Sequence, residues 1–230
     1  MKEQTIFITG CNRGLGLKFV EEYSKKGCHV IATCRNPDQA KELNLLKEHN
    51  KLIDIYALDV GNSEQIKKLA NKINEQPIDI LINNAGIYRS CTLGGLDKKS
   101  WLESFEINSI APYEIINAFL PNILRGKDKK VISITSKMGS IDDNTSGGSY
   151  IYRSSKTALN SVMRSLQHDL FNNDISTLTL HPGWVQTDMG GLGAWINVDE
   201  SINGMIEQIE QLNLSNSGQY LDYAGKKINW

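Results

Sequence analysis

The sequence predicts an α/β fold: a three-layer, doubly wound parallel sheet of about seven strands, with helices on both faces. Two observations predict this fold. Short runs rich in β-branched residues alternate with longer amphipathic runs, a pattern typical of parallel strands joined by helical crossovers. The chain has 230 residues, of which 40% are hydrophobic, which is enough apolar material for one large core. Because no linker, low-complexity tract or repeat interrupts the pattern, we expect residues 1–230 to form one domain.

The expected elements follow one another in a regular order. The expected strands are "TIFIT" (5–9), "HVIAT" (29–33), "LIDIYAL" (52–58), "IDILIN" (78–83), "KVISIT" (130–135), "STLTLH" (176–181) and a last short strand, "QYLDY" (219–223). The expected helices span residues 14–26, 38–48, 63–75, 98–124, 151–171 and 198–211. Their apolar residues recur at helical spacing, whereas those of the strands form short continuous runs.

The bulk composition argues against several classes of function. A formal net charge of −1 and a pI of about 6.4 give no electrostatic basis for binding nucleic acid or an anionic membrane. No run reaches about 18 consecutive apolar residues, so we expect no membrane span. The four cysteines and four histidines lack the paired spacing of metal ligands. This pattern predicts a reduced, cytoplasmic protein without a metal site.

A glycine-rich segment, "TGCNRGLG" (9–16), follows the first expected strand and opens the first expected helix. Gly10 permits a tight turn, and Gly14 and Gly16 let backbone N–H groups and the helix start approach a pyrophosphate. Three residues separate the first two glycines, so the spacing differs from the usual G-x-G-x-x-G fingerprint. The strand–loop–helix context nevertheless predicts a dinucleotide site.

The end of the second expected strand reads "TCRNPD" (33–38). An NAD-selective fold places an acidic residue here, on the ribose 2′-hydroxyl, but this chain has Arg35. The first carboxylate, Asp38, belongs to a pattern typical of a helix start. Arg35, helped by Arg13 of the glycine loop, could hold a 2′-phosphate. We therefore expect NADP(H) to be preferred over NAD(H), and an NAD-using dehydrogenase is the alternative.

The segment "GGSYIYRSSK" (147–156) opens a long expected helix and carries two tyrosines and a lysine. Side chains four residues apart share a helix face, so Tyr152 meets Lys156, whereas Tyr150 points elsewhere. Lys156 lies on the apolar stripe of this helix, and a charge on a buried stripe needs a functional reason. A surface Tyr–Lys pair without function is the alternative.

A phenol beside an ammonium is suited to proton transfer. The reference pKa of tyrosine is about 10, and moving it to about 7 requires roughly 4 kcal/mol of stabilisation of the phenolate. An ammonium about 4 Å away, at an effective dielectric constant near 20, supplies about that amount. We therefore expect Lys156 to lower the pKa of Tyr152.

Ordered motifs across nearly the whole chain resemble the short-chain dehydrogenase/reductase family, whose fold is of the Rossmann type. The motifs are "TGCNRGLG", "LDV" (58–60), "NNAG" (83–86), "IN" (107–108), "SITS" (133–136), "YRSSK" (152–156) and "HPGWVQTDM" (181–189). Two longer segments are similar to the C-factor/sniffer-like carbonyl reductases of that family. They are "GSIDDNTSGGSYIYRSSKTALN" (139–160) and "GQYLDYAGKKINW" (218–230).

The resemblance implies a catalytic set of Asn108, Ser136, Tyr152 and Lys156. Tyr152 would supply a proton, Ser136 would donate to the substrate oxygen, and Asn108 would hold a water that refills the proton path through Lys156. Ser136 lies sixteen residues before Tyr152, farther than is usual in the family. Ser140 is a rival at closer spacing, although only Ser136 ends a strand.

The resemblance also implies a cofactor site. Asp59 and Val60 would contact the adenine. The nicotinamide carboxamide would be held by Pro182, Gly183, Val185 and Thr187. The full set is Gly10, Asn12, Arg13, Gly14, Leu15, Gly16, Arg35, Asp59, Val60, Asn83, Ala85, Gly86, Tyr152, Lys156, Pro182, Gly183, Val185 and Thr187.

We therefore expect an NADPH-dependent oxidoreductase acting on CH–OH/C=O groups, which reduces a small apolar aldehyde or ketone to an alcohol or runs the reverse reaction. A small lid at about 188–197 would help close the substrate pocket. The pocket residues would be Tyr88, Met138, Trp184, Met189, Leu192 and Trp195. The alternative is an NADPH-binding module that signals through a partner protein and has vestigial catalysis. The resemblance also implies a homodimer or homotetramer.

Overall fold

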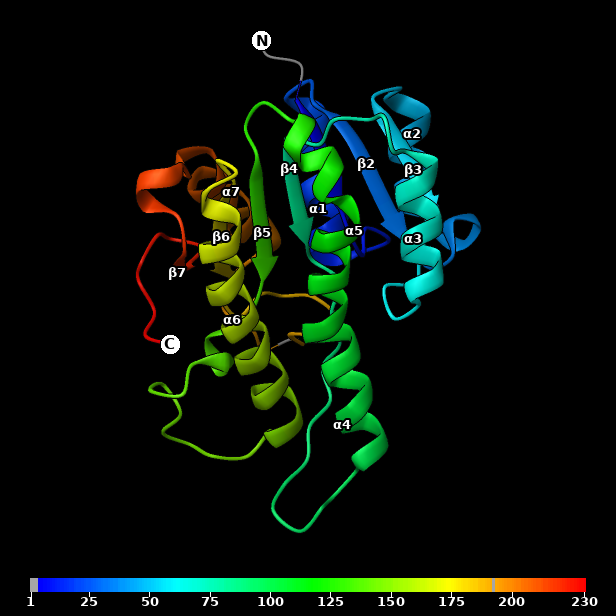
Figure 1. Cartoon of the computed structure of the whole chain (residues 1–230). Coiled ribbons are helices and arrows are strands. Elements are labelled where there is room, and N and C mark those ends of the chain that lie inside the picture. Colours follow the sequence, from blue (N-terminus) through cyan, green and yellow to red (C-terminus); the bar gives the residue numbers. More distant parts are fainter. Residues whose placement is uncertain (1–3, 192) are drawn as a thin grey trace.

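The computed structural model describes residues 4–191 and 193–230, and it confirms the doubly wound parallel sheet (Figure 1). The described strands form one seven-stranded parallel sheet in the order β3-β2-β1-β4-β5-β6-β7. The chain order reverses between β1 and β4, which is where such sheets bind ligands at the carboxyl ends of the strands. The strands are β1 Thr5–Ile8, β2 His29–Cys34, β3 Ile53–Ala57, β4 Ile80–Asn83, β5 Lys130–Ile134, β6 Ser176–His181 and β7 Gln219–Asp222.

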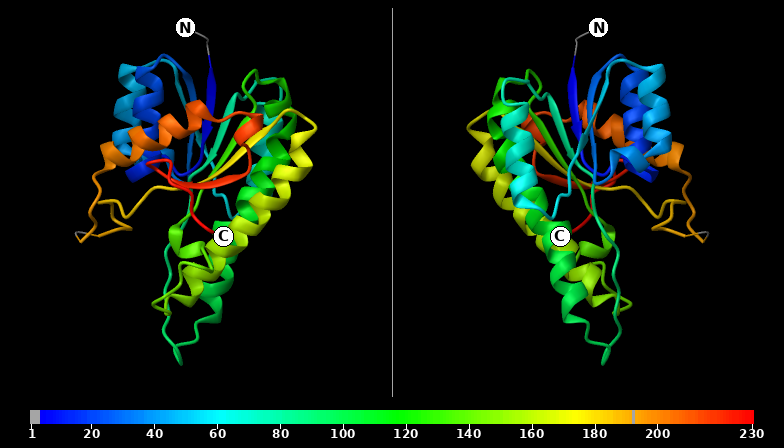
Figure 2. Two further views of the ribbon diagram at one scale, coloured as in Figure 1. Left: turned by 90° about the vertical axis from the view of Figure 1, so that its left-hand side faces the viewer. Right: turned by 90° about the vertical axis from the view of Figure 1, so that its right-hand side faces the viewer.

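Helices cover both faces of the sheet, as Figure 2 shows. Successive residues of a strand face opposite sides. Accordingly, Ile6 and Ile8 pack with α1, α2 and α7, whereas Phe7 packs with α3, α5 and α6. The ring centres of Phe7 and Phe119 lie 4.5 Å apart. The helices are α1 Gly14–Lys25, α2 Lys41–His49, α3 Ser63–Lys72, α4 Lys98–Phe105, α5 Ala111–Arg125, α6 Tyr150–Phe171 and α7 Val198–Gln211.

The prediction of a single helix over 98–124 is wrong, because a π-helical segment, Glu106–Ile110, separates α4 from α5. Pro112 follows at the start of α5 and has no N–H for the regular bonding pattern. A π turn holds one more residue than an α turn, so it changes which side chains face inward. Asn108 and Ser109 are buried at this point, and both face α6.

The helix expected over 38–48 begins later, at Lys41. The preceding residues, Pro37–Gln39, form a 3₁₀ turn, and Ala40 has the non-helical dihedral angles φ −85° and ψ 66°. The remaining expected elements agree with the structure to within three residues at each end.

Three further observations concern the described residues as a whole. None of their helices is both long enough and apolar enough to cross a bilayer. The four cysteines are free thiols. The described side chains contain no group of three histidine, cysteine or acidic residues that could hold a metal ion.

A buried carboxylate ties together the amino-terminal edge of the sheet. Asp79, which is 4% exposed, immediately precedes β4. It accepts hydrogen bonds from the backbone N–H groups of Thr5 (2.7 Å), Lys127 (2.6 Å) and Asp128 (3.4 Å). These bonds connect the start of β1 and the turn before β5 to the start of β4.

Replacing this carboxylate should weaken the fold. In Asp79→Asn an amide NH₂ takes the place of one acceptor oxygen and faces N–H donors, so we expect the free energy of unfolding to fall by about 3 kcal/mol. Urea unfolding measures the change. The control is Asp169→Asn on the exposed face of α6, which should shift stability by less than about 0.5 kcal/mol. Equal midpoints for the two variants would contradict the role of Asp79.

Candidate active site

The glycine loop lies between β1 and α1, at the carboxyl edge of the sheet. Gly10 and Gly14 have positive φ angles of 71° and 57°, which favour glycine. A Cβ atom on Gly16 would stand 2.2 Å from the carbonyl oxygen of Gly10. The side chain of Arg13 does not cap α1, so the positive end of the helix is open to an anionic group. This cradle fits a pyrophosphate.

Asn84 braces the glycine loop from the end of β4, and sequence reasoning overlooked it while selecting Asn83. The side-chain amide of Asn84 donates to the carbonyl oxygens of Thr9 (2.8 Å) and Gly10 (3.1 Å). Asn83 turns the other way and donates to the carbonyl of Pro112 at 3.3 Å. Neighbouring residues of a strand face opposite sides of the sheet. This period indicates that only one of Asn83 and Asn84 can face the glycine loop.

The other predicted cofactor residues gather at the same edge. Arg35 is exposed directly after β2, and Asp59 and Val60 follow the adjacent strand β3. A Cβ atom on Gly14 would lie 3.7 Å from Cγ2 of Thr187, so the segment after β6 reaches the glycine loop. The predicted residues of that segment are Pro182, Gly183, Val185 and Thr187.

Tyr152 and Lys156 lie on the buried face of α6, one turn apart, as predicted. Tyr152 is 8% exposed and Lys156 is 4% exposed. Nζ of Lys156 donates to the carbonyl oxygen of Ile134 at 3.0 Å and lies 6.0 Å from the centre of the Tyr152 ring. Burial lowers the pKa of Lys156 to about 8. The amine therefore points into the molecule, toward the end of β5.

The expected lowering of the Tyr152 pKa is wrong for the chain on its own. Burial is the largest cause and raises the pKa of Tyr152 to about 12, a hydrogen bond with Ser136 acts in the opposite direction, and Tyr88 adds to the rise. Lys156 does not form the close pair with the phenol that the prediction assumed, because its amine bonds to a backbone carbonyl. Desolvation of the phenolate is therefore the dominant effect on the pKa of Tyr152.

Ser136, and not Ser140, is the serine that lies beside Tyr152. Ser136 caps the 3₁₀ turn Lys137–Gly139, and its Oγ accepts a hydrogen bond from the N–H of Met138 at 3.2 Å. That bond uses an acceptor site of the hydroxyl, so its proton can be donated. The hydroxyl of Ser140 bonds within the following loop and to the last residue of the chain.

Asn108 joins the segment after β4 to α6. Its Oδ1 accepts from the N–H of Ile87 (2.9 Å), and its Nδ2 donates to the carbonyl of Ile87 (2.9 Å) and to Oγ of Ser155 (3.0 Å). A Cβ atom on Gly86 would lie 3.2 Å from Oδ1 of Asn108 and 3.5 Å from Nζ of Lys156. Asn108 and Lys156 therefore meet beside Gly86, and the water-holding role of Asn108 stays a prediction.

The predicted pocket residues form two separate groups. The ring of Tyr88 packs against the ring of Tyr152, with centres 4.8 Å apart. Trp184, in the segment after β6, packs against Trp195 of the lid, with ring centres 5.2 Å apart, and Trp195 is 82% exposed. Met138 is partly buried beside Ser136 and Met189 is exposed on the lid, whereas Leu192 lies outside the described residues.

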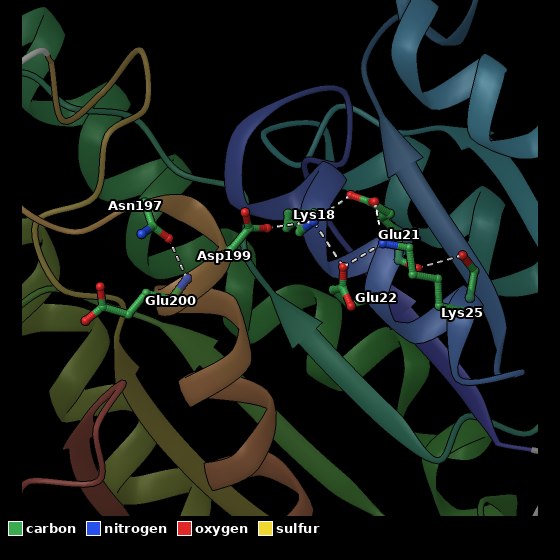
Figure 3. Close-up of polar contacts among 8 residues, drawn as sticks. Lys18, Glu21, Glu22, Lys25, Asn197, Asp199 and Glu200 are labelled. Atoms are coloured by element: carbon green, nitrogen blue, oxygen red, sulfur yellow. Dashed lines mark hydrogen bonds and ion pairs between the residues drawn. The ribbon is translucent and has the colours of Figure 1, made fainter.

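Ion pairs anchor both ends of the lid region to the start of α1. Arg13 pairs with Asp188 at 2.7 Å, and both side chains are well exposed. Beyond the lid, Lys18 pairs with Asp199 at the start of α7 at 2.7 Å (Figure 3). The same amine contacts two carboxylates of α1, so the Lys18 side chain is only 19% exposed. Figure 2 shows the described parts of this segment, 188–191 and 193–199, projecting from the face that carries α1 and α7.

Comparison with known proteins agrees with this geometry. A sequence model of the family described as short chain dehydrogenase matches residues 4–193. The chain is 42% identical, over 166 residues, to C-signal of Myxococcus xanthus, and the match covers 72% of this chain and 100% of that protein.

Two solved structures are similar over the whole chain. The carbonyl reductase Sniffer of D. melanogaster has a TM-score of 0.92 and 34% identity, and covers 99% of this chain and 100% of that chain. The NADPH-bound carbonyl reductase from chicken fatty liver has a TM-score of 0.94 and 34% identity, and covers 100% of both chains.

Lys156 should give the free protein a characteristic dependence of stability on pH. Its pKa is lowered from 10.5 to about 8, so between these values the unfolded chain holds the proton that the folded chain has released. The contribution of Lys156 to the free energy of unfolding therefore rises with pH across this window, by about 3 kcal/mol at about 1.4 kcal/mol per pH unit. Lys156→Met should remove the rise and be more stable than the native chain at pH 7.

Urea unfolding between pH 7 and about 10.5 measures this difference. The control is Lys47→Met on the exposed side of α2, which should follow the native curve. If Lys156→Met also follows the native curve, the amine is not buried as described.

Proposed function

The chain belongs to the short-chain dehydrogenase family, and we propose that it is an NADPH-dependent carbonyl reductase that converts a small apolar aldehyde or ketone to its alcohol. The proposal is carried by one observation: Tyr152 and Lys156 are buried together one turn apart on α6, with Ser136 close to the phenol. The cradle at the start of α1 supports a dinucleotide cofactor. The NADPH bound to the similar chicken enzyme supports the choice of NADPH.

Tyr152 and Ser136 would stabilise the negative charge that develops on the carbonyl oxygen of the substrate. Bound NADPH would supply the hydride to the carbonyl carbon. As that carbon accepts hydride, Tyr152 donates its proton to the oxygen and Ser136 donates a hydrogen bond to it. A phenol whose pKa is about 12 is protonated at neutral pH, which is the form that reduction requires.

Lys156 would stabilise the phenolate that remains after proton transfer. With a pKa of about 8, its amine is mostly charged at pH 7, and it lies behind the Tyr152 ring. Oxidation would first require the phenolate, which at pH 7 lies about 7 kcal/mol above the phenol in the free chain. In the free chain the phenol form therefore predominates, and this is the form that can donate a proton to a carbonyl oxygen.

The remaining parts of the proposal are the expectations drawn from the sequence. The substrate is a small carbonyl compound or alcohol, and the lid at 188–197 helps to cover it. We propose one domain, a cytoplasmic location, and a homodimer or homotetramer without a nucleic-acid or membrane partner.

A second candidate is a module that binds NADPH and signals through a partner protein, with vestigial catalysis. The name of the relative C-signal, at 42% identity, favours it. Full biological activity of a Tyr152→Phe chain in its own host would support this candidate over the reductase.

Removing the phenol hydroxyl should abolish turnover while sparing the cofactor site. We expect Tyr152→Phe to lower kcat by about 1,000-fold, because the proton donor is lost, with the Kd for NADPH unchanged within about threefold. NADPH consumption with a panel of aldehydes and ketones measures the effect. The control is Tyr150→Phe, two residues earlier and 39% exposed, which should keep native kcat. Native turnover by Tyr152→Phe would refute the assignment.

Arg35 should distinguish the two nicotinamide cofactors. Arg35→Ala removes a cation placed for the 2′-phosphate, so the Kd for NADPH should rise at least about tenfold while the Kd for NADH stays nearly constant. Fluorescence titration with each cofactor measures the ratio. The control is Arg164→Ala on the exposed face of α6, which should change neither value. Equal losses for both cofactors in Arg35→Ala would favour the NAD-using dehydrogenase instead.

A further inference from the structure

A tyrosine of the last strand, β7, hydrogen-bonds to the backbone of Ser136. Tyr220 lies in β7 and is 2% exposed. Its hydroxyl donates a hydrogen bond to the carbonyl oxygen of Ser136 at 2.6 Å, across 84 positions in the sequence. Because β6 lies between β5 and β7, this side chain links the edge of the sheet to the end of β5.

We propose that Tyr220 is a positioning residue for carbonyl reduction, and that it acts through the main chain of Ser136 to set where the Ser136 hydroxyl stands relative to Tyr152. The inference rests on the function proposed above, and it concerns a buried residue outside the predicted catalytic and cofactor sets.

Ser136 lies just beyond the point where the sheet holds the chain. The N–H of Thr135 donates to the carbonyl of Leu180 in β6 at 2.9 Å, and the paired register of β5 and β6 ends at Ile134 and Leu180. The carbonyl group of Ser136, two residues beyond the end of β5, accepts instead from the Tyr220 hydroxyl and from the N–H of Gly139 in its own turn. The Tyr220 hydroxyl therefore holds a carbonyl group that lies beyond the last backbone pairing of β5 with β6.

The opposite side of the turn is already fixed against α6. The carbonyl of Gly139 accepts from Oγ1 of Thr157 (2.9 Å) and from Nδ2 of Asn160 (3.2 Å). A Cβ atom on Gly139 would lie 2.9 Å from Cβ of Lys156, so the turn touches the helix directly. With one end held by α6, the bond from Tyr220 determines the orientation of the other end, which bears the catalytic hydroxyl.

Tyr220 is itself held in place by the end of the chain. Its ring packs against the ring of Trp230, with centres 5.3 Å apart. The carbonyl oxygen of Trp230 accepts from the N–H of Ile141 (3.2 Å) and from Oγ of Ser140 (3.4 Å). The same segment thus supports both Tyr220 and the loop that follows Ser136.

The position of Ser136 affects the acidity of the reacting phenol. The titratable groups that face this region are Lys156 on α6, Tyr88 after β4 and Tyr220 on β7, with Asp143 near Tyr220. The hydrogen bond with Ser136 lowers the pKa of Tyr152 against the effect of burial. A displaced Ser136 would weaken this bond, so the pKa of Tyr152 would rise.

The test is Tyr220→Phe, which keeps the ring and its contact with Trp230 and removes the hydroxyl. We expect kcat to fall about tenfold, with KM for NADPH and for the carbonyl compound unchanged within about twofold. The alkaline limb of the pH–rate profile, where the phenol loses its proton, should move to higher pH. The matched control is Tyr23→Phe, since Tyr23 is also 2% exposed and its hydroxyl has no hydrogen-bond partner among the described residues. It should leave kcat and the profile unchanged.

A double mutant separates positioning from a general loss of structure. In a Ser136→Ala background the serine hydroxyl is absent, so adding Tyr220→Phe should lower kcat by less than about twofold. A full tenfold fall in that background, or a native kcat and profile in Tyr220→Phe alone, would overturn the proposal.

A spectroscopic readout keeps the test independent of the reaction. The ¹³Cζ resonance of Tyr152, identified by its loss in Tyr152→Phe, reports the hydrogen bonding of the phenol oxygen. If the native protein reduces no carbonyl compound, the proposed function has failed, and this resonance still decides the role of Tyr220. A shift in Tyr220→Phe but not in Tyr23→Phe supports the role, and an unchanged resonance overturns it.

Discussion

The buried amine of Lys156, held by the carbonyl of Ile134, is the contact around which the site is arranged. An ammonium in the interior is unfavourable by itself, as its lowered pKa indicates, so the surrounding chain must make room for it. Gly86 leaves space beside the amine and Asn108, and Gly139 allows close approach to the backbone and Cβ of Lys156. The 3₁₀ turn after β5 therefore packs closely against α6, and the serine that caps it comes to lie beside the phenol of Tyr152.

The two ends of the lid region are held with different strength. The pair between Arg13 and Asp188 is exposed on both sides, and such pairs contribute little in water. Lys18 is more shielded and contacts three carboxylates, including Asp199, so the start of α7 is the firmer anchor. A phosphate at the glycine loop would compete with Asp188 for Arg13. Binding of a phosphate there would therefore weaken the pair that holds this end of the lid.

The sequence was sufficient for the sheet, because strand–helix alternation is a pattern of many residues that no single exception disturbs. It was also sufficient to pair Tyr152 with Lys156, since a helix fixes which side chains share a face. It could not reveal the π turn at Asn108, because one inserted residue hardly alters a hydrophobic period. The pKa of Tyr152 was also out of reach, since it depends on how deeply the ring is buried and on where the lysine amine points.

The hydrogen bond between Tyr220 and Ser136 has a consequence for how the protein matures. The glycine loop near the amino terminus depends on neighbours in the first half of the chain, whereas Ser136 depends on a strand synthesised near the end. Contacts between distant parts of a sequence form late, because the intervening chain must be ordered first. A nascent chain on the ribosome can therefore form the bonds between its glycine loop and Asn84 well before the bond that aligns Ser136.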